Sequence, residues 1–255
     1  MPTPIVMVHG AFCAGWAFDA FRAPFEAAGH PVAAPDLPGH EADPRRRAVA
    51  GRSMSDYAGA VRRVIDAQPE PPILIGHSLG GLVAQMAASR SRVAGLILLA
   101  PSAPWGVTGS TAEEAISAVS LYALGPYWAL AVDPDYTSAR RYLFDRLAPA
   151  ARRATFARLT PESGRALWET LNWWLDPFAT TLVSKAAIGA PVLALVGARD
   201  AIHPPATVRA TASRLGGETR LFPGMSHWLV AEPGWEEVAE TCLSWIARLS
   251  ARDAA

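Results

Sequence analysis

Short apolar runs alternate with longer amphipathic segments in the first and last thirds of the chain. Within the runs the hydrophobic residues are consecutive, as in Leu96-Ile97-Leu98-Leu99, which is typical of strands buried on both faces. We predict strands over residues 5–9, 31–36, 72–76, 94–100, 191–197 and 219–222. We predict helices over residues 16–28, 53–67, 79–89, 206–215 and 236–249. This alternation predicts an α/β protein with a mostly parallel sheet of about six strands, covered by helices.

The middle of the chain, residues 105–188, has a different pattern. It shows no clear strand run, and prolines interrupt it at Pro126, Pro134, Pro149, Pro161 and Pro177. The pattern therefore predicts several short helices. Because the segment lies between two predicted strands, we interpret it as a helical cap, or lid, inserted into a core made of residues 1–104 and 189–255. The alternative is a helical layer that only enlarges the core.

Composition and charge exclude several classes of protein. Hydrophobic residues make up 51% of the chain and charged residues 18%, which excludes an intrinsically disordered protein. Lys and Arg together number 23, as do Asp and Glu, so the net charge is zero. A neutral chain argues against general electrostatic binding to nucleic acid or to a membrane surface. Two cysteines, Cys13 and Cys242, make neither a disulfide framework nor a zinc site.

No targeting or membrane signal is evident in the sequence. The first residues lead directly into an apolar run, without the charged stretch and long hydrophobic region of a secretory signal. No run approaches the roughly 18 apolar residues of a spanning helix. We expect a cytoplasmic protein, while a longer precursor and a homo-oligomer both stay open.

The sharpest chemical signal is the run Gly76-His77-Ser78-Leu79-Gly80. It has the form G-x-S-x-G between a predicted strand and a predicted helix, which is the context of a nucleophilic serine at a sharp turn. The two glycines let backbone segments approach closely without a clash at Cβ. We interpret Ser78 as a nucleophile, and the alternative is an ordinary N-cap serine.

With this motif the chain resembles the α/β-hydrolase superfamily, and the resemblance covers almost the whole chain. The family's chain order is nucleophile, acid, histidine. In those places stand Asp200, just after the strand predicted at 191–197, and His227, between the last strand and the closing helix. The resemblance thus implies a triad in which Asp200 orients His227, and His227 takes the proton of Ser78. The alternative for Asp200 is a cap on the following helix.

A second resemblance concerns His9-Gly10-Ala11, at the end of the first predicted strand. In the family this loop and the residue after the nucleophile supply the N–H groups of the oxyanion hole. The resemblance implies the backbone amides of Ala11 and Leu79 as donors, with Phe12 as the alternative to Ala11. We interpret His9 itself as a structural residue that holds the loop.

Four further residues are candidates for the substrate pocket because they flank these motifs: Phe12, Trp16, His77 and Trp228. Core packing is the alternative role of each, and His203 is interpreted as part of the loop or pocket rim. The aromatic side chains indicate substrates that are small-to-medium hydrophobic or aromatic molecules.

The serine at position 78 disfavours dehalogenase and epoxide hydrolase chemistry, which in this superfamily calls for an aspartate. The run from His9 to Trp16 is similar to the methyl-esterase and hydroxynitrile-lyase branch. The lyases of that branch carry threonine where Gly10 stands and lysine where Trp228 stands, so hydrolysis is favoured. We predict a carboxylesterase that forms an acyl-enzyme on Ser78 and needs no metal or cofactor. The alternatives are a carbon–carbon bond hydrolase, lyase or perhydrolase with the same triad, and a ligand-binding receptor that retains the fold.

Overall fold

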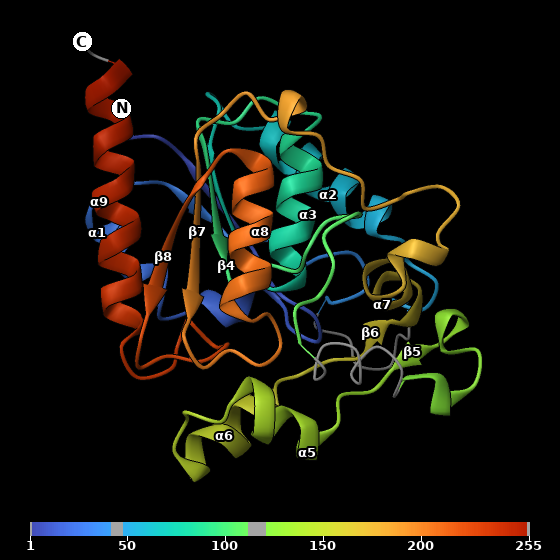
Figure 1. Ribbon diagram of the computed structural model, residues 1–255. Coiled ribbons are helices and arrows are strands. Elements are labelled where there is room, and N and C mark those ends of the chain that lie inside the picture. The colour runs from blue at the N-terminus through green and yellow to red at the C-terminus, as the bar shows by residue number, and fades with distance from the viewer. Residues whose placement is uncertain (1, 42–47, 112–120, 254–255) are drawn as a thin grey trace.

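The computed structural model describes residues 2–41, 48–111 and 121–253. Its centre is a six-stranded sheet with strand order β2-β1-β3-β4-β7-β8, in which every neighbouring pair is parallel (Figure 1). The strands are β1 (Ile5–Val8), β2 (Val32–Ala33), β3 (Ile73–His77), β4 (Gly95–Leu99), β7 (Val192–Gly197) and β8 (Glu218–Phe222). The predicted α/β architecture with a parallel sheet is confirmed.

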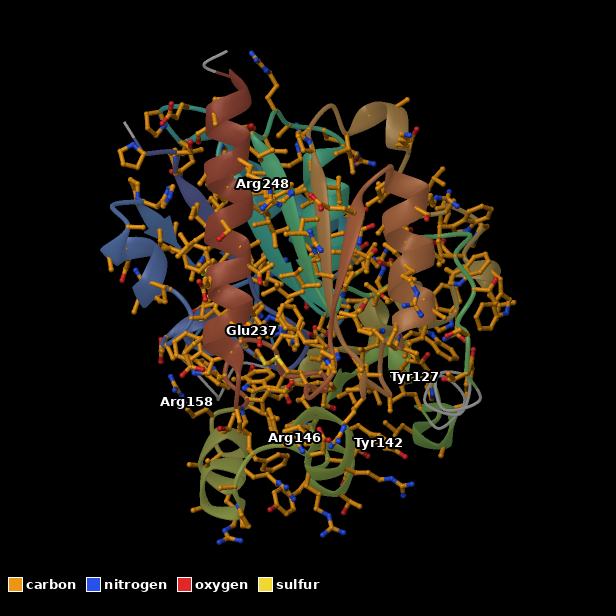
Figure 2. All side chains as sticks on the ribbon, turned by 60° about the vertical axis from the view of Figure 1, so that its left-hand side comes forward. Tyr127, Tyr142, Arg146, Arg158, Glu237 and Arg248 are labelled. Atoms are coloured by element: carbon orange, nitrogen blue, oxygen red, sulfur yellow. The ribbon has the colours of Figure 1, made fainter. Side chains whose placement is uncertain are left out.

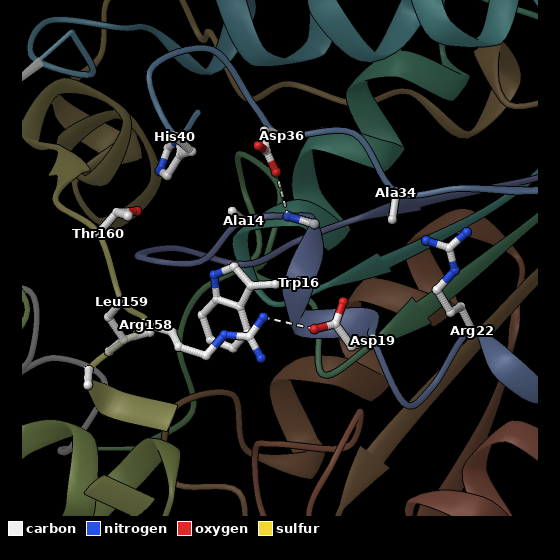
Figure 3. Close-up of a pocket in the computed structure, with 12 residues that line it drawn as sticks. Ala14, Trp16, Asp19, Arg22, Ala34, Asp36, His40, Arg158, Leu159 and Thr160 are labelled. Atoms are coloured by element: carbon white, nitrogen blue, oxygen red, sulfur yellow. Dashed lines mark hydrogen bonds and ion pairs between the residues drawn. The ribbon is translucent and has the colours of Figure 1, made fainter. Parts of the chain in front are cut away.

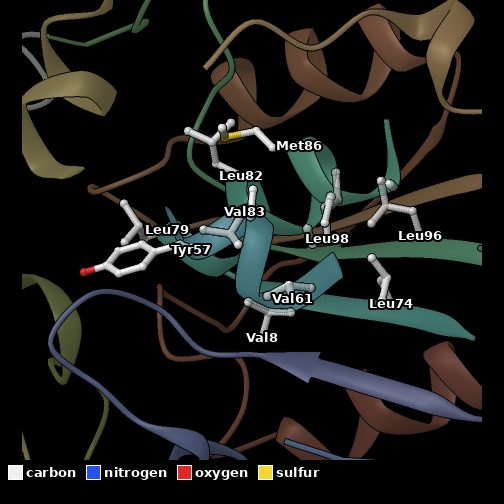
Figure 4. Packing of buried hydrophobic residues seen from close by; sticks show 14 of the residues in the cluster. Val8, Tyr57, Val61, Leu74, Leu79, Leu82, Val83, Met86, Leu96 and Leu98 are labelled. Atoms are coloured by element: carbon white, nitrogen blue, oxygen red, sulfur yellow. The ribbon is translucent and has the colours of Figure 1, made fainter. Parts of the chain in front are cut away.

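Every residue of the strands β1, β3, β4 and β7 is buried. Successive side chains enter opposite faces of the sheet, so Val6 and Leu74 join one core cluster while Ile5 and Ile73 join the other. The helices α2 (Met54–Asp66), α3 (Leu79–Ala88) and α8 (Pro205–Leu215) cover the first face. The helices α1 (Ala23–Ala27) and α9 (Trp235–Asp253) cover the second. Figure 4 shows the first cluster, with Val8, Leu74, Leu96 and Leu98 packed near Tyr57, Val61, Leu82 and Val83.

Two predicted elements near the N-terminus are corrected by the structure. The helix predicted over 16–28 is a 3₁₀ turn at Gly15–Phe18 followed by the short helix α1. Pro24 lies in the first turn of α1, where proline is tolerated, whereas inside a longer helix its ring would clash with the preceding turn. The strand predicted over 31–36 is only two residues long, because Asp36 and Leu37 turn away to bond the loop after β1.

The chain between β4 and β7 forms several short elements and is called the cap segment (residues 105–188). In its described residues the helical elements are η2 (Leu121–Leu124), η3 (Tyr127–Ala129), α5 (Tyr136–Ser138), η4 (Ala139–Leu143), α6 (Pro149–Phe156), α7 (Gly164–Leu171), η5 (Trp173–Leu175) and η6 (Lys185–Ala187). It also contains an antiparallel pair, β5 (Ala131–Val132) with β6 (Glu162–Ser163), which the sequence did not predict. Two-residue strands are too short to produce an alternating pattern.

The elements α5, α6, α7, β5 and β6 lie toward the edge where β4, β7 and β8 end, and the last part of the segment runs back to the opposite edge, where β7 begins (Figure 1). Since β4 and β7 are neighbours in the sheet, the segment leaves and re-enters between adjacent strands. The division into a core and a separate cap stays a prediction. None of the helices in the described ranges combines the length and the apolar character that crossing a membrane requires.

Candidate active site

Ser78 stands at the sharp turn between β3 and α3. Its backbone has φ 54° and ψ −124°, a conformation that is strained for a residue with a side chain. A Cβ atom on Gly80 would lie 2.2 Å from the carbonyl oxygens of Val8 and His9, and one on Gly76 would lie 2.5 Å from the oxygen of Gly80. The glycines therefore permit the close approach that the motif predicted.

His227 and Asp200 are brought together from the loops after β8 and β7. The Nδ1 atom of His227 donates to Oδ2 of Asp200 at 2.9 Å, and both side chains are buried. The second oxygen of Asp200 accepts the amides of Ile202 and His203 at 2.9 and 2.8 Å. Burial alone would raise the pKa of Asp200, but the facing His227 ring holds that pKa below its ordinary value. The carboxylate thus fixes the tautomer of His227, whose Nε2 has no partner among the described residues.

The loop that carries His227 is held by a buried glutamate that sequence reasoning missed. The Ser226 amide donates to Oε1 of Glu232 at 2.6 Å, and Glu232 is 1% exposed. Burial raises the pKa of Glu232 to about 7, the Ser226 amide partly offsets this rise, and Asp145 adds to it. The only signal in the sequence was an acidic residue directly after the apolar run 228–231.

Two of the predicted pocket residues, His77 and Trp228, are buried directly behind His227. The Nε2 atom of His77 donates to the backbone carbonyl of His227 at 3.0 Å, and burial lowers the pKa of His77 to about 3. The Trp228 ring lies 5.3 Å from that of His77 and 5.0 Å from that of Phe144, between ring centroids. Such burial favours their packing role and gives His227 a rigid support.

His203 lies beside the predicted triad. Its ring centroid is 5.3 Å from that of His227, and its Nε2 is 3.0 Å from Oγ of Ser102. The Ser102 amide in turn donates to the carbonyl of Ser78 at 2.9 Å. Burial lowers the pKa of His203 to about 3, so it stays neutral beside His227.

The loop after β1 packs directly against Ser78, and its residues Gly10–Cys13 are called the oxyanion loop because the sequence predicts that this loop supplies an oxyanion donor. A Cβ atom on Gly10 would lie 3.0 Å from Cβ of Ser78. Phe12 donates its amide to Oε2 of Glu162 at 3.2 Å, whereas the Ala11 amide has no acceptor within the described part of the chain. Leu79 begins α3, where first-turn N–H groups lack a partner within the helix. The amides of Ala11 and Leu79 are therefore among those that remain open near Ser78.

His9 holds this loop through both ring nitrogens. Its Nδ1 donates to the carbonyl of Gly10 at 2.9 Å, and its Nε2 accepts from the amide of Leu37 at 2.9 Å. Burial lowers the pKa of His9 to about 3, so the neutral form needed for both bonds is favoured. The bonds fit the structural role predicted for His9.

Trp16 lines a cavity of about 620 Å³ that Ser78 does not line (Figure 3), and its ring centroid lies 6.3 Å from that of Trp228. The cavity is lined partly by charged side chains, and no member of the predicted triad lines it. The guanidinium of Arg158 stacks 4.3 Å from the Trp16 ring and bonds Asp19 at 2.8 Å. Arg158 thereby joins the cap segment to the first part of the chain (Figure 2).

Glu162 is a second buried acid near the site that sequence reasoning missed. Its carboxylate reaches the Phe12 amide from the cap segment, where no pattern of acidic residues indicated a functional site. Among the described residues no three His, Cys, Asp or Glu side chains are arranged to hold a metal ion.

The chain belongs to the α/β-hydrolase family, because residues 5–241 match the alpha/beta hydrolase family. It is similar to Pyrethroid hydrolase from Sphingobium wenxiniae, with 38% identity over 114 residues, and to Salicylic acid-binding protein 2 from Nicotiana tabacum, with 33% identity over 110 residues. These alignments cover 43% and 42% of this chain, and 40% and 42% of the two relatives. The matched segments thus span about two fifths of those relatives.

Solved structures share the fold along nearly the whole chain. Tomato Methylketone Synthase I superposes with a TM-score of 0.75 at 20% identity, over 98% of this chain and 99% of that one. The methylesterase protein MES16 from Arabidopsis superposes with a TM-score of 0.70 at 16% identity, over 96% and 99% of the two chains. At these identities the likeness shows the fold, and the chemistry must be argued from the site.

Proposed function

We propose that the protein is a serine esterase that hydrolyses carboxylic esters through an acyl-enzyme on Ser78. The observation that carries this proposal is the buried bond from His227 to Asp200, together with a serine at a strained turn. A serine hydroxyl needs a base to become nucleophilic, and a histidine oriented by a carboxylate is such a base. Relatives that match part of the chain are named as a pyrethroid hydrolase and a methylesterase, which is consistent with ester cleavage.

The reaction proceeds in two steps. Oγ of Ser78 attacks the ester carbonyl while Nε2 of His227 takes the hydroxyl proton, and Asp200 stabilises the resulting cation. The amides of Ala11 and Leu79 bind the oxyanion, at about 3–4 kcal/mol per donor. His227 then gives the proton to the leaving alkoxide. In the second step His227 activates water, which releases the acid and frees Ser78.

The substrates that fit best are small-to-medium hydrophobic or aromatic esters. Apolar residues of the cap segment pack beside the oxyanion loop, where Tyr127 and Leu167 form a cluster that contacts Ala11 and Phe12. An apolar wall next to the oxyanion site favours an apolar acyl or alcohol group by burying its surface. We propose that the cap segment covers the site and selects substrates through this wall.

Initial rates on p-nitrophenyl esters from acetate to laurate test the proposal, with Ser78→Ala as the control. We expect turnover by the wild-type protein and its loss in the variant, and the chain-length profile measures the acyl pocket. A serine-reactive phosphonate is used in parallel. Absence of ester turnover would overturn the proposal. Labelling of Ser78 in that case would favour carbon–carbon cleavage, and absence of labelling would favour a receptor.

A further inference from the structure

The carboxylate of Glu162 is fully buried and accepts four hydrogen bonds. Oε1 accepts the Tyr57 hydroxyl at 2.6 Å and the Ser163 amide at 2.7 Å. Oε2 accepts Nε2 of His40 at 3.1 Å and the Phe12 amide at 3.2 Å. A carboxylate has about four lone-pair positions, so its bonding capacity is filled.

These contacts keep Glu162 ionised inside the protein. Burial alone would raise the pKa of Glu162, but the His40 ring and the bonds from His40, Tyr57 and Ser163 hold it below its ordinary value. Burial opposes the charge on His40, yet Glu162 raises the pKa of that ring above its ordinary value. Phe12 therefore donates its amide to a charged acceptor, which makes a stronger bond than a neutral one.

Phe12 needs such support because its backbone is strained. Its φ of 63° lies in the left-handed region, which costs a residue with a Cβ atom about 1–2 kcal/mol. The turn of the oxyanion loop is closed only by a long bond of 3.4 Å from the Cys13 amide to the Gly10 carbonyl. The Thr160 amide donates to the Phe12 carbonyl at 2.9 Å. Thr160 and Glu162 of the cap segment thus bond both polar backbone groups of one strained residue.

We propose that Glu162 is a positioning residue that holds the oxyanion loop in its working conformation from the cap segment. The peptide group is planar, so fixing the Phe12 N–H also fixes the Ala11 carbonyl on the opposite side. A flip of this peptide would turn the Ala11 carbonyl toward the Glu162 carboxylate, which repels it. The Ala11 amide belongs to the preceding peptide group and has no acceptor among the described residues. With the loop held in this conformation it can bind the oxyanion, with Leu79 as the second donor. The inference rests on the proposed esterase function.

The substitution Glu162→Gln tests this role because glutamine keeps the size and removes the charge. An amide nitrogen in place of one oxygen would face a donor, so the bond to Phe12 is weakened. We expect kcat on a p-nitrophenyl ester to fall about 10–100-fold, part of the loss seen when an oxyanion donor is removed. KM should change less than about threefold, because the effect is specific to the transition state.

A comparison of an oxygen ester with its thionoester supplies a readout that a general loosening of the structure would not change. Sulfur in place of the carbonyl oxygen accepts hydrogen bonds poorly, so a working oxyanion hole strongly prefers the oxygen ester. We expect this preference, measured as a ratio of kcat/KM, to shrink about tenfold in Glu162→Gln. Tyr57→Phe removes a single bond to Glu162 and should shift the ratio in the same direction by less. If Glu162→Gln does not fold, Tyr57→Phe tests the proposal in its place.

Glu169→Gln is the matched control. Glu169 is another buried glutamate of the cap segment, and it bonds Ser53 and Met54 at the start of α2 and Arg165, with no hydrogen bond to the oxyanion loop. We expect it to lower Tm while leaving the thionoester ratio unchanged. An unchanged ratio and kcat in folded Glu162→Gln would overturn the inference, as would an equal shift in Glu169→Gln. Ester turnover by Ser78→Ala at the wild-type rate would instead overturn the proposed function.

Discussion

The two sides of the candidate site are built in different ways. On the sheet side, Ser78, Asp200 and His227 each follow a strand within a few residues, so local sequence places them. On the cap side, Glu162 reaches Phe12 across 150 positions of the chain. The comparison teaches that the proposed reacting groups lie on short local motifs, whereas Glu162, which is proposed to hold the oxyanion loop, comes from a distant segment. The predictions below test each side in turn.

The largest effect is expected on the sheet side, from Asp200→Asn. Asparagine keeps the shape but no longer holds His227 in the tautomer with a free Nε2. We expect kcat to fall about 10⁴-fold, as in other serine triads with this change. Steady-state kinetics on the best p-nitrophenyl ester measures it. A loss below about tenfold would mean that Asp200 only binds its loop amides, as a structural residue would.

The turn that carries Ser78 is tested next, by the paired variants Gly80→Ala and Gly59→Ala. At Gly80 a methyl group would meet backbone oxygens at 2.2 Å, whereas at Gly59, inside α2, it would meet nothing within 4 Å. We expect Gly80→Ala to lower the free energy of unfolding by about 3 kcal/mol. Gly59→Ala should raise it by about 0.5–1 kcal/mol. Urea unfolding measures both, and equal effects would refute the close approach at the turn.

The support of His227 predicts a pH dependence through Glu232, whose pKa is raised to about 7 in the folded protein. A raised pKa favours the protonated folded form, so this stabilisation is complete below about pH 4 and is lost as the pH rises through 7. Glutamine carries no such charge. As the pH rises from 5 to 8, we therefore expect the wild type to lose about 2 kcal/mol of unfolding free energy that Glu232→Gln keeps. A difference that does not vary with pH would contradict the role of burial.

The smallest effect is expected at the exposed contact between the two sides. Arg158 stacks on Trp16 and pairs with Asp19 at the surface, where water and salt screen the interaction. We expect Arg158→Ala to cost about 0.5–1 kcal/mol in unfolding free energy and to leave kcat unchanged. A kcat loss as large as that of Glu162→Gln would show that any contact with the cap segment matters equally.

The same contrast explains what the sequence could predict. Consecutive apolar residues mark strands buried on both faces, and the loops after them carried Ser78, Asp200 and His227. The glycines of the serine turn have a local steric reason, which the structure confirms. The contact of Glu162 with Phe12 joins segments that meet only after folding, so no local pattern indicated it. Glu232 bonds the Ser226 amide within the same loop, but a single acidic residue after an apolar run does not by itself indicate this contact.

The errors in the predicted elements have the same origin. The helix predicted over 16–28 rested on the apolar pattern alone and left Pro24 out of account. Proline is tolerated in the first turn of a helix, as in α1, but it interrupts a helix that begins earlier. The strand predicted over 31–36 stops early because Asp36 bonds the Gly15 amide, a contact between distant segments. The β5–β6 pair was missed because each strand has two residues.

The most direct test is to trap the acyl-enzyme. The wild-type protein is mixed with p-nitrophenyl acetate, quenched in acid during the first turnovers, digested and analysed by mass spectrometry. We expect an acetyl group on the peptide that bears Ser78, and none on the same peptide from Ser78→Ala. Steady turnover with an unmodified Ser78 peptide, or an acetyl group on a different residue that the reaction requires, would overturn the proposed mechanism.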